Sequence, residues 1–379
     1  MKKTLALFLT IFSLNGYTAL PTQVQHDDNM EKTIAAVMKE YQVPGVAVEL
    51  YKDGVSYSYY AGYANQDRKI PVTQRTIFEL GSISKVMTGL LFAQEIDMAN
   101  MFLTDPANKF VPNLSKNLSD VTLQELATHT SGLPFTAPLD QTQTLDDFQH
   151  YLKGLSVAEK PGDQWIYSNV GIGILGYALE NATHKSFDEL YRRHILNPLA
   201  MYPIGLTVPN AYRKFYAQGY DYAGKPVDPL PHGMLASAIA IKASSIDMQH
   251  FLSAAIGLPG TPERVFYPMR LTQTAFVKLP DRMQGLGWQI QTITAWNKSS
   301  LLNPVQAAPS MEVEEIYDRP VYNGDTLIDK TGSTNGFRAY IAVLPNRKSG
   351  IVILANKAIP ESVIVRAGRS ILFQAAKIA

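Results

Sequence analysis

A helical spacing of apolar residues opens the chain. Between residues 30 and 42, apolar side chains recur every three or four positions, as at Ile34 and Tyr41, and most positions between them are polar. This pattern predicts an amphipathic helix, for which Asp28 or Asn29 is the expected N-cap because its side chain can accept a backbone N–H. We expect this helix to share a layer with the strands predicted below.

Strand-like runs follow this helix and recur near the C-terminus. Residues 46–51 and 55–63 are joined across Asp53-Gly54, a dipeptide that favours a tight hairpin turn. The C-terminal part has matching elements, namely strands over 336–344 and 351–356, a turn at Pro345-Asn346 and an apolar-faced helix over 359–378. The two ends of the chain are therefore expected to build one mixed antiparallel sheet flanked by terminal helices.

The middle of the chain is dominated by helical patterns. They lie at residues 82–98, 123–128, 145–155, 170–182 and 187–196. The polar stretch 297–313 predicts a long surface loop. The expected fold class is α/β (α+β) in one domain over 20–379, with an α/β part from 30–81 and 282–379 and a helical subdomain from 82–281.

Composition narrows the class of protein. Of 379 residues, 46% are hydrophobic and 18% are charged, which is typical of a globular chain with a large core. The formal net charge is only +1 and no basic run could contact many phosphates, so nucleic acid is not an expected partner. Cysteine is absent and the seven histidines lack paired ligand spacing, so neither a metal nor another cofactor is expected.

The first residues have the pattern of an export signal. Lys2 and Lys3 precede an apolar run over 5–14, about half of the ~20 residues that a membrane-spanning helix needs. We expect a signal peptide over 1–19, with a membrane anchor as the alternative. No later segment is long and apolar enough to span a bilayer, so a soluble monomer in the periplasm is expected, with secretion as the other destination.

A candidate nucleophile stands at the start of the helix predicted over 82–98. Ser82 is followed three residues later by Lys85, and this spacing places both side chains on one face of a helix. A partly desolvated lysine can take the proton of the serine, and the helix N-terminus offers backbone N–H groups where negative charge develops. The pair is common by chance, so it carries weight only together with further motifs.

The sequence Tyr167-Ser168-Asn169 supplies two groups that such a serine would need. The phenol of Tyr167 can shuttle a proton between the serine and a departing nitrogen, and the amide of Asn169 can hold a substrate amide. Ser168 is expected to have a supporting role, because its side chain points away from the nucleophile.

The third motif is Lys330-Thr331-Gly332, followed by Ser333. The charge of Lys330 can stabilise a phenolate or a substrate carboxylate, and Thr331 is an expected substrate contact. Gly332 leaves the strand edge open to the acyl group, and the N–H groups of Ser82 and Ser333 can form an oxyanion hole.

These three motifs, in this order, resemble those of the class C serine β-lactamases and of related penicillin-binding peptidases and esterases. Other segments that match this family are 43–47, 78–82, 126–134, 285–288, 330–337 and 354–357. The resemblance implies a β-lactamase/transpeptidase-like fold, an active site between the sheet and the helical subdomain, and no metal. It also implies that Ser82 forms an acyl-enzyme with β-lactams, that Asn356 contacts the substrate, and that the activity confers antibiotic resistance.

Several substrate-contact positions depart from the class C pattern. They are Ala358, Glu361 and Ile364, where the family usually has asparagines and an arginine, Ile239 in place of a common tyrosine, and Thr136 in place of a side-chain amide. The resemblance implies that Glu361 would repel a β-lactam carboxylate. Arg366 lies about half a helical turn beyond the expected arginine and is expected to reach the same place.

These departures keep two alternatives open. A D-alanyl-D-alanine carboxypeptidase or an esterase of the same superfamily would share the acylation step and differ in deacylation. A binding module for peptidoglycan fragments would lack the serine or the lysine, and both are present.

Two other motifs are assigned structural roles. Residues 171–176 fit the G-x-G-x-x-G pattern of dinucleotide-binding proteins, but no parallel strand precedes them, so a glycine-lined helix packed behind Tyr167 is expected instead. His129 is expected to pack beneath the site and not to act as the base.

Overall fold

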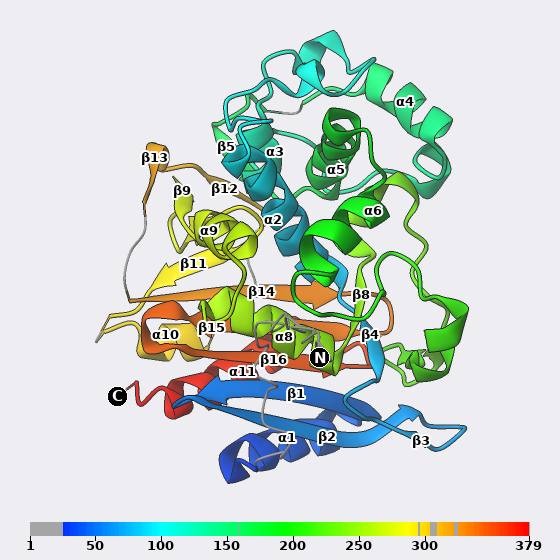
Figure 1. Cartoon of the computed structure of the whole chain (residues 1–379), viewed down its shortest axis with the longest axis vertical. Helices are drawn as coiled ribbons and strands as arrows, with labels where there is room; N and C mark the ends of the chain where they lie inside the picture. Colours follow the sequence, from blue (N-terminus) through cyan, green and yellow to red (C-terminus); the bar gives the residue numbers. More distant parts are fainter. Residues whose placement is uncertain (1–25, 158, 295, 304–308, 322–324, 379) are drawn as a thin grey trace, which may run out of the picture.

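The computed structural model describes residues 26–157, 159–294, 296–303, 309–321 and 325–378. A ten-stranded antiparallel sheet crosses the molecule, and helices lie on both of its faces (Figure 1). The predicted signal peptide, residues 1–19, lies outside the described residues. None of the helices within these ranges has both the length and the apolar character of a membrane-spanning helix.

The sheet has ten strands in the order β13-β9-β10-β11-β14-β15-β16-β1-β2-β3. In chain order, they are β1 (Gly45–Lys52), β2 (Val55–Asn65), β3 (Ile70–Pro71), β9 (Ala275–Lys278), β10 (Met283–Gln284), β11 (Gln289–Thr292), β13 (Glu315–Val321), β14 (Thr326–Ser333), β15 (Arg338–Leu344) and β16 (Ser349–Ala355). The N-terminal hairpin therefore pairs directly with the C-terminal strand β16. The predicted antiparallel sheet built from both ends of the chain is confirmed.

Both faces of the central strands are buried, which explains their continuous apolar sequences. In β15, Ile341 and Val343 belong to one hydrophobic cluster, and the alternating residues Tyr340 and Leu344 belong to the other. Because successive side chains of a strand point to opposite faces, a strand covered on both sides cannot alternate polar and apolar residues.

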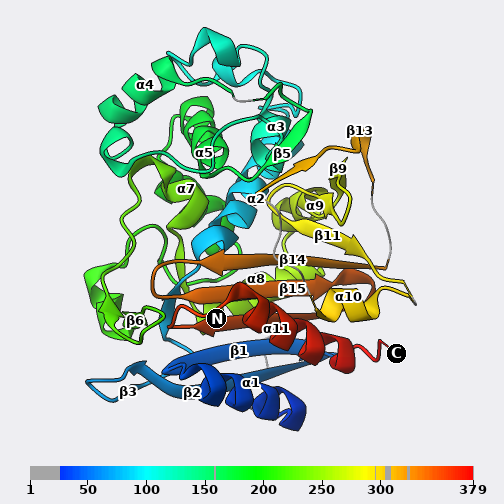
Figure 2. The same cartoon turned by 180° about the vertical axis from the view of Figure 1, so that it is seen from behind.

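The terminal helices cover one face of the sheet. Figure 2 shows α1 (Asp28–Tyr41) and α11 (Glu361–Ala375) on this face, where the two helices contact each other. The N-cap of α1 is Asp27, whose carboxylate accepts the N–H of Met30. The predicted N-cap, Asp28 or Asn29, was therefore wrong by one or two residues. At the other end of α1, the ammonium of Lys357 donates to the carbonyl of Tyr41, a favourable place for a cation.

The other helices gather on the opposite face and beyond β14. They are α2 (Ser84–Asp97), α3 (Leu123–Thr128), α4 (Leu145–Gly154), α5 (Asn169–Thr183), α6 (Phe187–Tyr191), α7 (Ala236–Ile239), α8 (Ser245–Ile256) and α9 (Glu263–Thr272). Helix α8 packs directly on β1 and β16, whereas α2 packs against α5, α7 and α9. The helix expected over 187–196 continues from α6 into a π-helical turn, Arg192–Leu196.

Two segments needed tertiary contacts to be assigned. The predicted surface loop over 297–313 contains α10 (Lys298–Leu302) and β12 (Ser310–Glu312) on either side of residues 304–308, which fall outside the described part. Strand β12 pairs with β5 (Gln164–Ile166), a partner about 145 residues away that local sequence cannot reveal. The prediction of one continuous loop was therefore wrong.

The glycine-rich segment 171–176 lies within α5, as expected, and its glycines allow close packing. A Cβ atom on Gly176 would lie 2.3 Å from Ser237 Oγ, and one on Gly173 would lie 2.6 Å from a methyl of Leu235. The glycines therefore bring α5 against α7 and the turn before it, and the packing explanation is confirmed.

A buried carboxyl group lies between the sheet and α8. Glu49 of β1 is 1% exposed and accepts hydrogen bonds from the hydroxyls of Ser58, Tyr60 and Ser245. Burial raises the pKa of Glu49 from 4.5 to about 7, although the three hydroxyls oppose this shift.

This carboxyl group makes stability depend on pH. The folded protein holds the proton of Glu49 more tightly than the unfolded chain does, so its contribution is complete below pH 4.5 and is lost as the pH rises to about 7. In Glu49→Gln, the free energy of unfolding should fall less between these pH values than in the wild type, by up to about 3 kcal/mol. Urea unfolding at a series of pH values measures this difference, and parallel curves would contradict it.

Candidate active site

The predicted nucleophile lies in a tight turn beside the sheet. Ser82 is the middle residue of a 3-10 turn, Gly81–Ile83, which leads directly into α2. The side chain of Ser82 is partly exposed, whereas its neighbours on both sides are buried. Gly81 has a φ of 51°, and a Cβ atom there would lie 2.5 Å from the backbone nitrogen of Ser333, so only glycine fits.

Lys85 lies where a proton acceptor for Ser82 must lie. Its Nζ is 3.0 Å from Ser82 Oγ and 3.0 Å from the carbonyl oxygen of Ala238, and the side chain is fully buried. Burial, opposed by Tyr167 and assisted by the nearby charge of Lys330, lowers the pKa of Lys85 from 10.5 to about 8. A substantial neutral fraction of Lys85 is therefore available at physiological pH.

Tyr167 lies close to both lysines. The ammonium groups of Lys85 and Lys330 are each 4.8 Å from the centre of its ring. Burial alone would raise the pKa of Tyr167, but the charges of Lys330 and Lys85 outweigh burial and lower it to about 8. The hydroxyl is close to Ser82 and Lys85, yet it makes no hydrogen bond of normal geometry within the described residues. This oxygen can therefore accept or donate a proton during a reaction.

The ring of Tyr167 is held from behind by aromatic side chains. His129 is buried, its ring centre is 4.4 Å from that of Tyr167, and Trp165 contacts both rings. The Nδ1 atom of His129 accepts the N–H of Ser168, and burial keeps the pKa of His129 well below its usual range. Neutral His129 thus packs beneath the site, as expected.

The loop between β5 and α5 orients the next motif residue. Ser168 is the N-cap of α5, where its hydroxyl accepts the N–H of Gly171 and donates to the carbonyl of Pro134. This arrangement confirms the supporting role of Ser168 and places Asn169 at the first position of α5. The Oδ1 atom of Asn169 is buried with no hydrogen-bond partner among the described residues, so it can accept an N–H from a substrate.

The third motif lies on a half-open strand. β11 pairs with β14 over Thr326–Asp329, whereas β15 pairs with β14 as far as Ser333. Residues 330–333 therefore have one edge that β11 does not cover, and this edge faces the turn of Ser82. A Cβ atom on Gly332 would lie 1.9 Å from the carbonyl oxygen of Leu80, so glycine is required for this close approach.

A buried ion pair fixes this strand. Asp329, just before Lys330, accepts hydrogen bonds from Arg369 of α11, at 2.7 Å, and from the hydroxyl of Tyr340, at 2.6 Å. Both members of the ion pair are almost completely buried. Removing one charge of such a pair would leave the other buried without compensation, so these contacts lock the register of β14 against α11.

Comparison with known proteins supports one family. The sequence profile of the Beta-lactamase family matches residues 30–376. A beta-lactamase of Escherichia coli (strain K12) is 32% identical over 377 residues, or 98% of each chain. The chain belongs to the beta-lactamase family. A beta-lactamase of Pseudomonas fluorescens is 31% identical over 364 residues, covering 90% of this chain and 97% of the relative, and one of Yersinia enterocolitica is 30% identical over 390 residues, covering 98% and 99%.

Membership of the beta-lactamase family confirms the resemblance noted in the sequence. Asn356 is fully buried, and its Nδ2 donates to the carbonyl oxygens of Tyr63, Ala64 and Gln218. Its Oδ1, like that of Asn169, is buried with no hydrogen-bond partner among the described residues. In the structure Asn356 therefore holds three backbone segments together, and its contact with a substrate stays a prediction.

The positions that depart from the class C pattern lie in different environments. Ile364 is part of the hydrophobic core between α11 and the sheet, and Ala358 is buried with its N–H bonded to Tyr220. Arg366 is exposed and lies close enough to Tyr41 of α1 to act on it electrostatically. Thr136 and Glu361 are exposed, and Ile239 is partly exposed.

Some groups at the site were not found from the sequence. The carbonyl of Ala238 binds Lys85, and backbone groups carry no signal in a motif. Phe135 is 58% exposed with its ring centre 6.1 Å from that of Tyr167, so it forms part of the rim. An exposed aromatic residue after the buried segment 126–133 was the signal that could have identified it.

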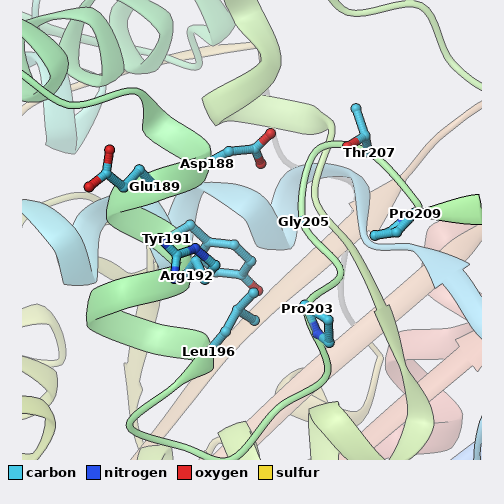
Figure 3. Close-up of a pocket in the computed structure, with 9 residues that line it drawn as sticks. All are labelled: Asp188, Glu189, Tyr191, Arg192, Leu196, Pro203, Gly205, Thr207 and Pro209. Atoms are coloured by element: carbon cyan, nitrogen blue, oxygen red, sulfur yellow. The ribbon is translucent and has the colours of Figure 1, made fainter. Parts of the chain in front are cut away.

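A separate pocket lies beside α6. It is lined by residues between Asp188 and Pro209, and none of the motif side chains is among them (Figure 3). The catalytic groups are therefore not located in this pocket. In the described ranges there is no cluster of three or more His, Asp or Glu side chains suited to a metal.

The close approach at Gly332 makes a prediction about stability. In Gly332→Ala, the new Cβ would collide with the carbonyl of Leu80 and force β14 away from the Ser82 turn, at a cost of about 1–3 kcal/mol in the free energy of unfolding. Gly154→Ala is the matched control, because a Cβ there meets no atom within 4 Å. Denaturant unfolding of both variants decides the point, and equal stabilities would contradict it.

The two lysines make a prediction about Tyr167. Without the charge of Lys330, burial dominates, so in Lys330→Met the pKa of Tyr167 should rise from about 8 by about 1–3 pH units. Titration of the tyrosinate absorbance measures this change, and Tyr167→Phe identifies which part of the signal belongs to this residue. An unchanged pKa would show that Lys330 does not act on the phenol.

Proposed function

We propose that this protein hydrolyses the β-lactam amide bond of penicillins and cephalosporins through a serine acyl-enzyme, and so confers resistance to these antibiotics. The observation that carries the proposal is the short contact between Lys85 Nζ and Ser82 Oγ beside Tyr167, a phenol with a lowered pKa. The named activity of the relatives gives further support.

In the acylation step, Ser82 Oγ attacks the carbonyl carbon and its proton passes to Lys85 or Tyr167. The backbone N–H groups of Ser82 and Ser333 stabilise the oxyanion. The close approach of the Ser82 turn to the end of β14 supports this assignment. When the carbon–nitrogen bond breaks, the nitrogen takes a proton from Tyr167, and Lys330 stabilises the resulting phenolate by its charge.

Substrate contacts complete the proposed site. Asn169 holds the amide of the acyl side chain, because its Oδ1 is buried without a partner in the described residues. The open edge of β14 at Thr331, Gly332 and Ser333 pairs with the acyl group. In deacylation, a water molecule gives one proton to Tyr167 or Lys85 and attacks the ester, which releases the product acid and restores Ser82.

A D-alanyl-D-alanine carboxypeptidase or an esterase is the second candidate function. Both would use the same acylation chemistry, and one observation favours the esterase, because the leaving D-alanine of a carboxypeptidase substrate carries a carboxylate. The carboxylate of Glu361 is hydrogen-bonded to Ser333, next to the proposed oxyanion hole.

We further propose that residues 20–379 form one catalytic domain, with an α/β part from 30–81 and 282–379 and a helical part from 82–281. The protein acts as a monomer after export to the periplasm.

Hydrolysis of a chromogenic cephalosporin by the purified mature protein tests the function. Turnover should fall by at least about a thousandfold in Ser82→Ala, because the nucleophile is lost. Ser299→Ala, an exposed serine of α10, is the matched control and should retain full activity. Intact-mass measurement should detect an acyl adduct on the wild type and on Ser299→Ala but not on Ser82→Ala.

The outcomes separate the candidates. Turnover that depends on Ser82 supports the lactamase. A persistent adduct without turnover supports the carboxypeptidase, and neither adduct nor turnover directs the search to ester substrates.

A further inference from the structure

A buried arginine lies at the end of the catalytic strand. Arg338, the first residue of β15, stands directly opposite Ser333 in the β14–β15 register and is only 6% exposed. Ser333 in turn lies against the turn of the nucleophile, because a Cβ atom on Gly81 would be 2.5 Å from the Ser333 nitrogen. Directly opposed residues of an antiparallel pair have Cα atoms about 5 Å apart, so Arg338 is one strand away from the proposed oxyanion hole.

The guanidinium group of Arg338 stays at this end of the sheet. Its Nη1 donates to the carbonyls of Thr334 and Phe337, in the turn between β14 and β15, at 2.8 Å each. Its Nε donates to the carbonyl of Ile359, in the segment that leads into α11, at 2.7 Å. Because Thr334 directly follows Ser333, these bonds fix the positive charge next to the end of β14.

Arg338 differs from the other buried arginines of the described residues. Arg369 is paired with the carboxylate of Asp329, and Arg282 is paired with that of Asp281. Arg338 forms no ion pair in the described part of the chain, and its acceptors are three carbonyls and a phenol hydroxyl, all of them neutral. A buried charge without a counterion costs free energy, and an anionic ligand would offset that cost.

One donor of this guanidinium group is also unused. An arginine has five N–H donors, and the hydrogen bonds of Arg338 engage four of them. The fifth is on Nη2, whose one acceptor among the described residues is the hydroxyl of Tyr222, at 2.9 Å. Tyr222 is 63% exposed, and its ring centre is 5.4 Å from the guanidinium carbon. The unused donor is therefore on the nitrogen next to an exposed side chain, where a ligand has access.

Two other charged groups lie near this end of β14. Glu361 accepts a hydrogen bond from the hydroxyl of Ser333, but it is exposed, so water and salt screen its charge. Lys330 is 3% exposed, and its ammonium lies over the ring of Tyr167. The charge of Arg338 is screened much less than that of Glu361, because the arginine is almost completely buried.

We propose that Arg338 is a specificity-determining residue that binds the carboxylate of the substrate next to the scissile bond. The inference rests on the proposed function, because it assigns the anion-binding group of the same acyl-transfer site. The unused N–H of Nη2 donates to the carboxylate, and the buried charge attracts it more strongly than the exposed Glu361 repels it. A hydrogen bond of this kind between charged groups changes affinity by about tenfold or more.

The test compares a chromogenic cephalosporin that has a free carboxylate with its neutral methyl ester. In the wild type, kcat/KM should be higher for the acid by about tenfold or more. In Arg338→Met, the ratio of kcat/KM for the acid to that for the ester should fall by about tenfold or more, because the charge and the donor are lost. Arg338→Lys keeps the charge and should retain most of the ratio. Since both substrates are measured on one preparation, the ratio does not depend on the fraction of folded protein.

The chain offers two matched controls. Arg347 follows the other end of β15 and is paired with Asp325, so Arg347→Met removes the same charge far along the strand and should leave the ratio unchanged. Arg366→Met tests the cation that the sequence placed here and should also leave it unchanged. If Arg338→Met does not fold, Arg338→Gln is measured instead, because its amide can still donate to a carbonyl of the turn.

The failures of the two proposals can be distinguished. A wild type with no preference for the acid, or an unchanged ratio in the neutral variant of Arg338, would contradict the inference. A ratio that falls in Arg366→Met but not in that variant would assign the carboxylate to Arg366 and overturn the inference as well. If the wild type hydrolyses neither cephalosporin, the proposed function fails, and a carboxylate-bearing and a neutral nitrophenyl ester then decide the inference by the same ratio.

Discussion

The structure depends on the close approach of two backbone segments, the turn that holds Ser82 and the half-open end of β14. Two glycines allow it, because a Cβ atom on Gly81 or on Gly332 would lie within 2.5 Å of the opposite backbone. This contact joins the first helix of the helical layer to the central sheet. It also brings the serine, the lysine of the third motif and the backbone N–H of Ser333 together, although they are distant in sequence.

Electrostatics at the site follows from burial at this junction. Lys85 and Lys330 are almost completely buried beside the ring of Tyr167, and their charges hold the pKa of the phenol at about 8. The same burial lowers the pKa of Lys85 to about 8, so both groups can take part in proton transfer near neutral pH. Neutral His129 beneath the ring adds no charge of its own, which preserves this balance.

Residues away from the catalytic groups maintain the geometry. The ion pair of Asp329 and Arg369 fixes β14 to α11, and Asn356 joins the start of the sheet to the loop before β6 (Gly219–Tyr220). Since α11 also carries Glu361, the contact that fixes the strand also places the carboxylate beside Ser333.

The sequence by itself determined the sheet built from both ends, the principal helices and the pairing of Ser82 with Lys85. These features depend on periodicity or on a three-residue spacing within one helix, and both are local. Only the tertiary structure decided that Asn356 and Ile364 are buried, that β12 pairs with β5, and that Ser333 binds Glu361. Burial and long-range hydrogen bonds depend on which surfaces meet when the chain packs, and no local pattern of residues encodes that.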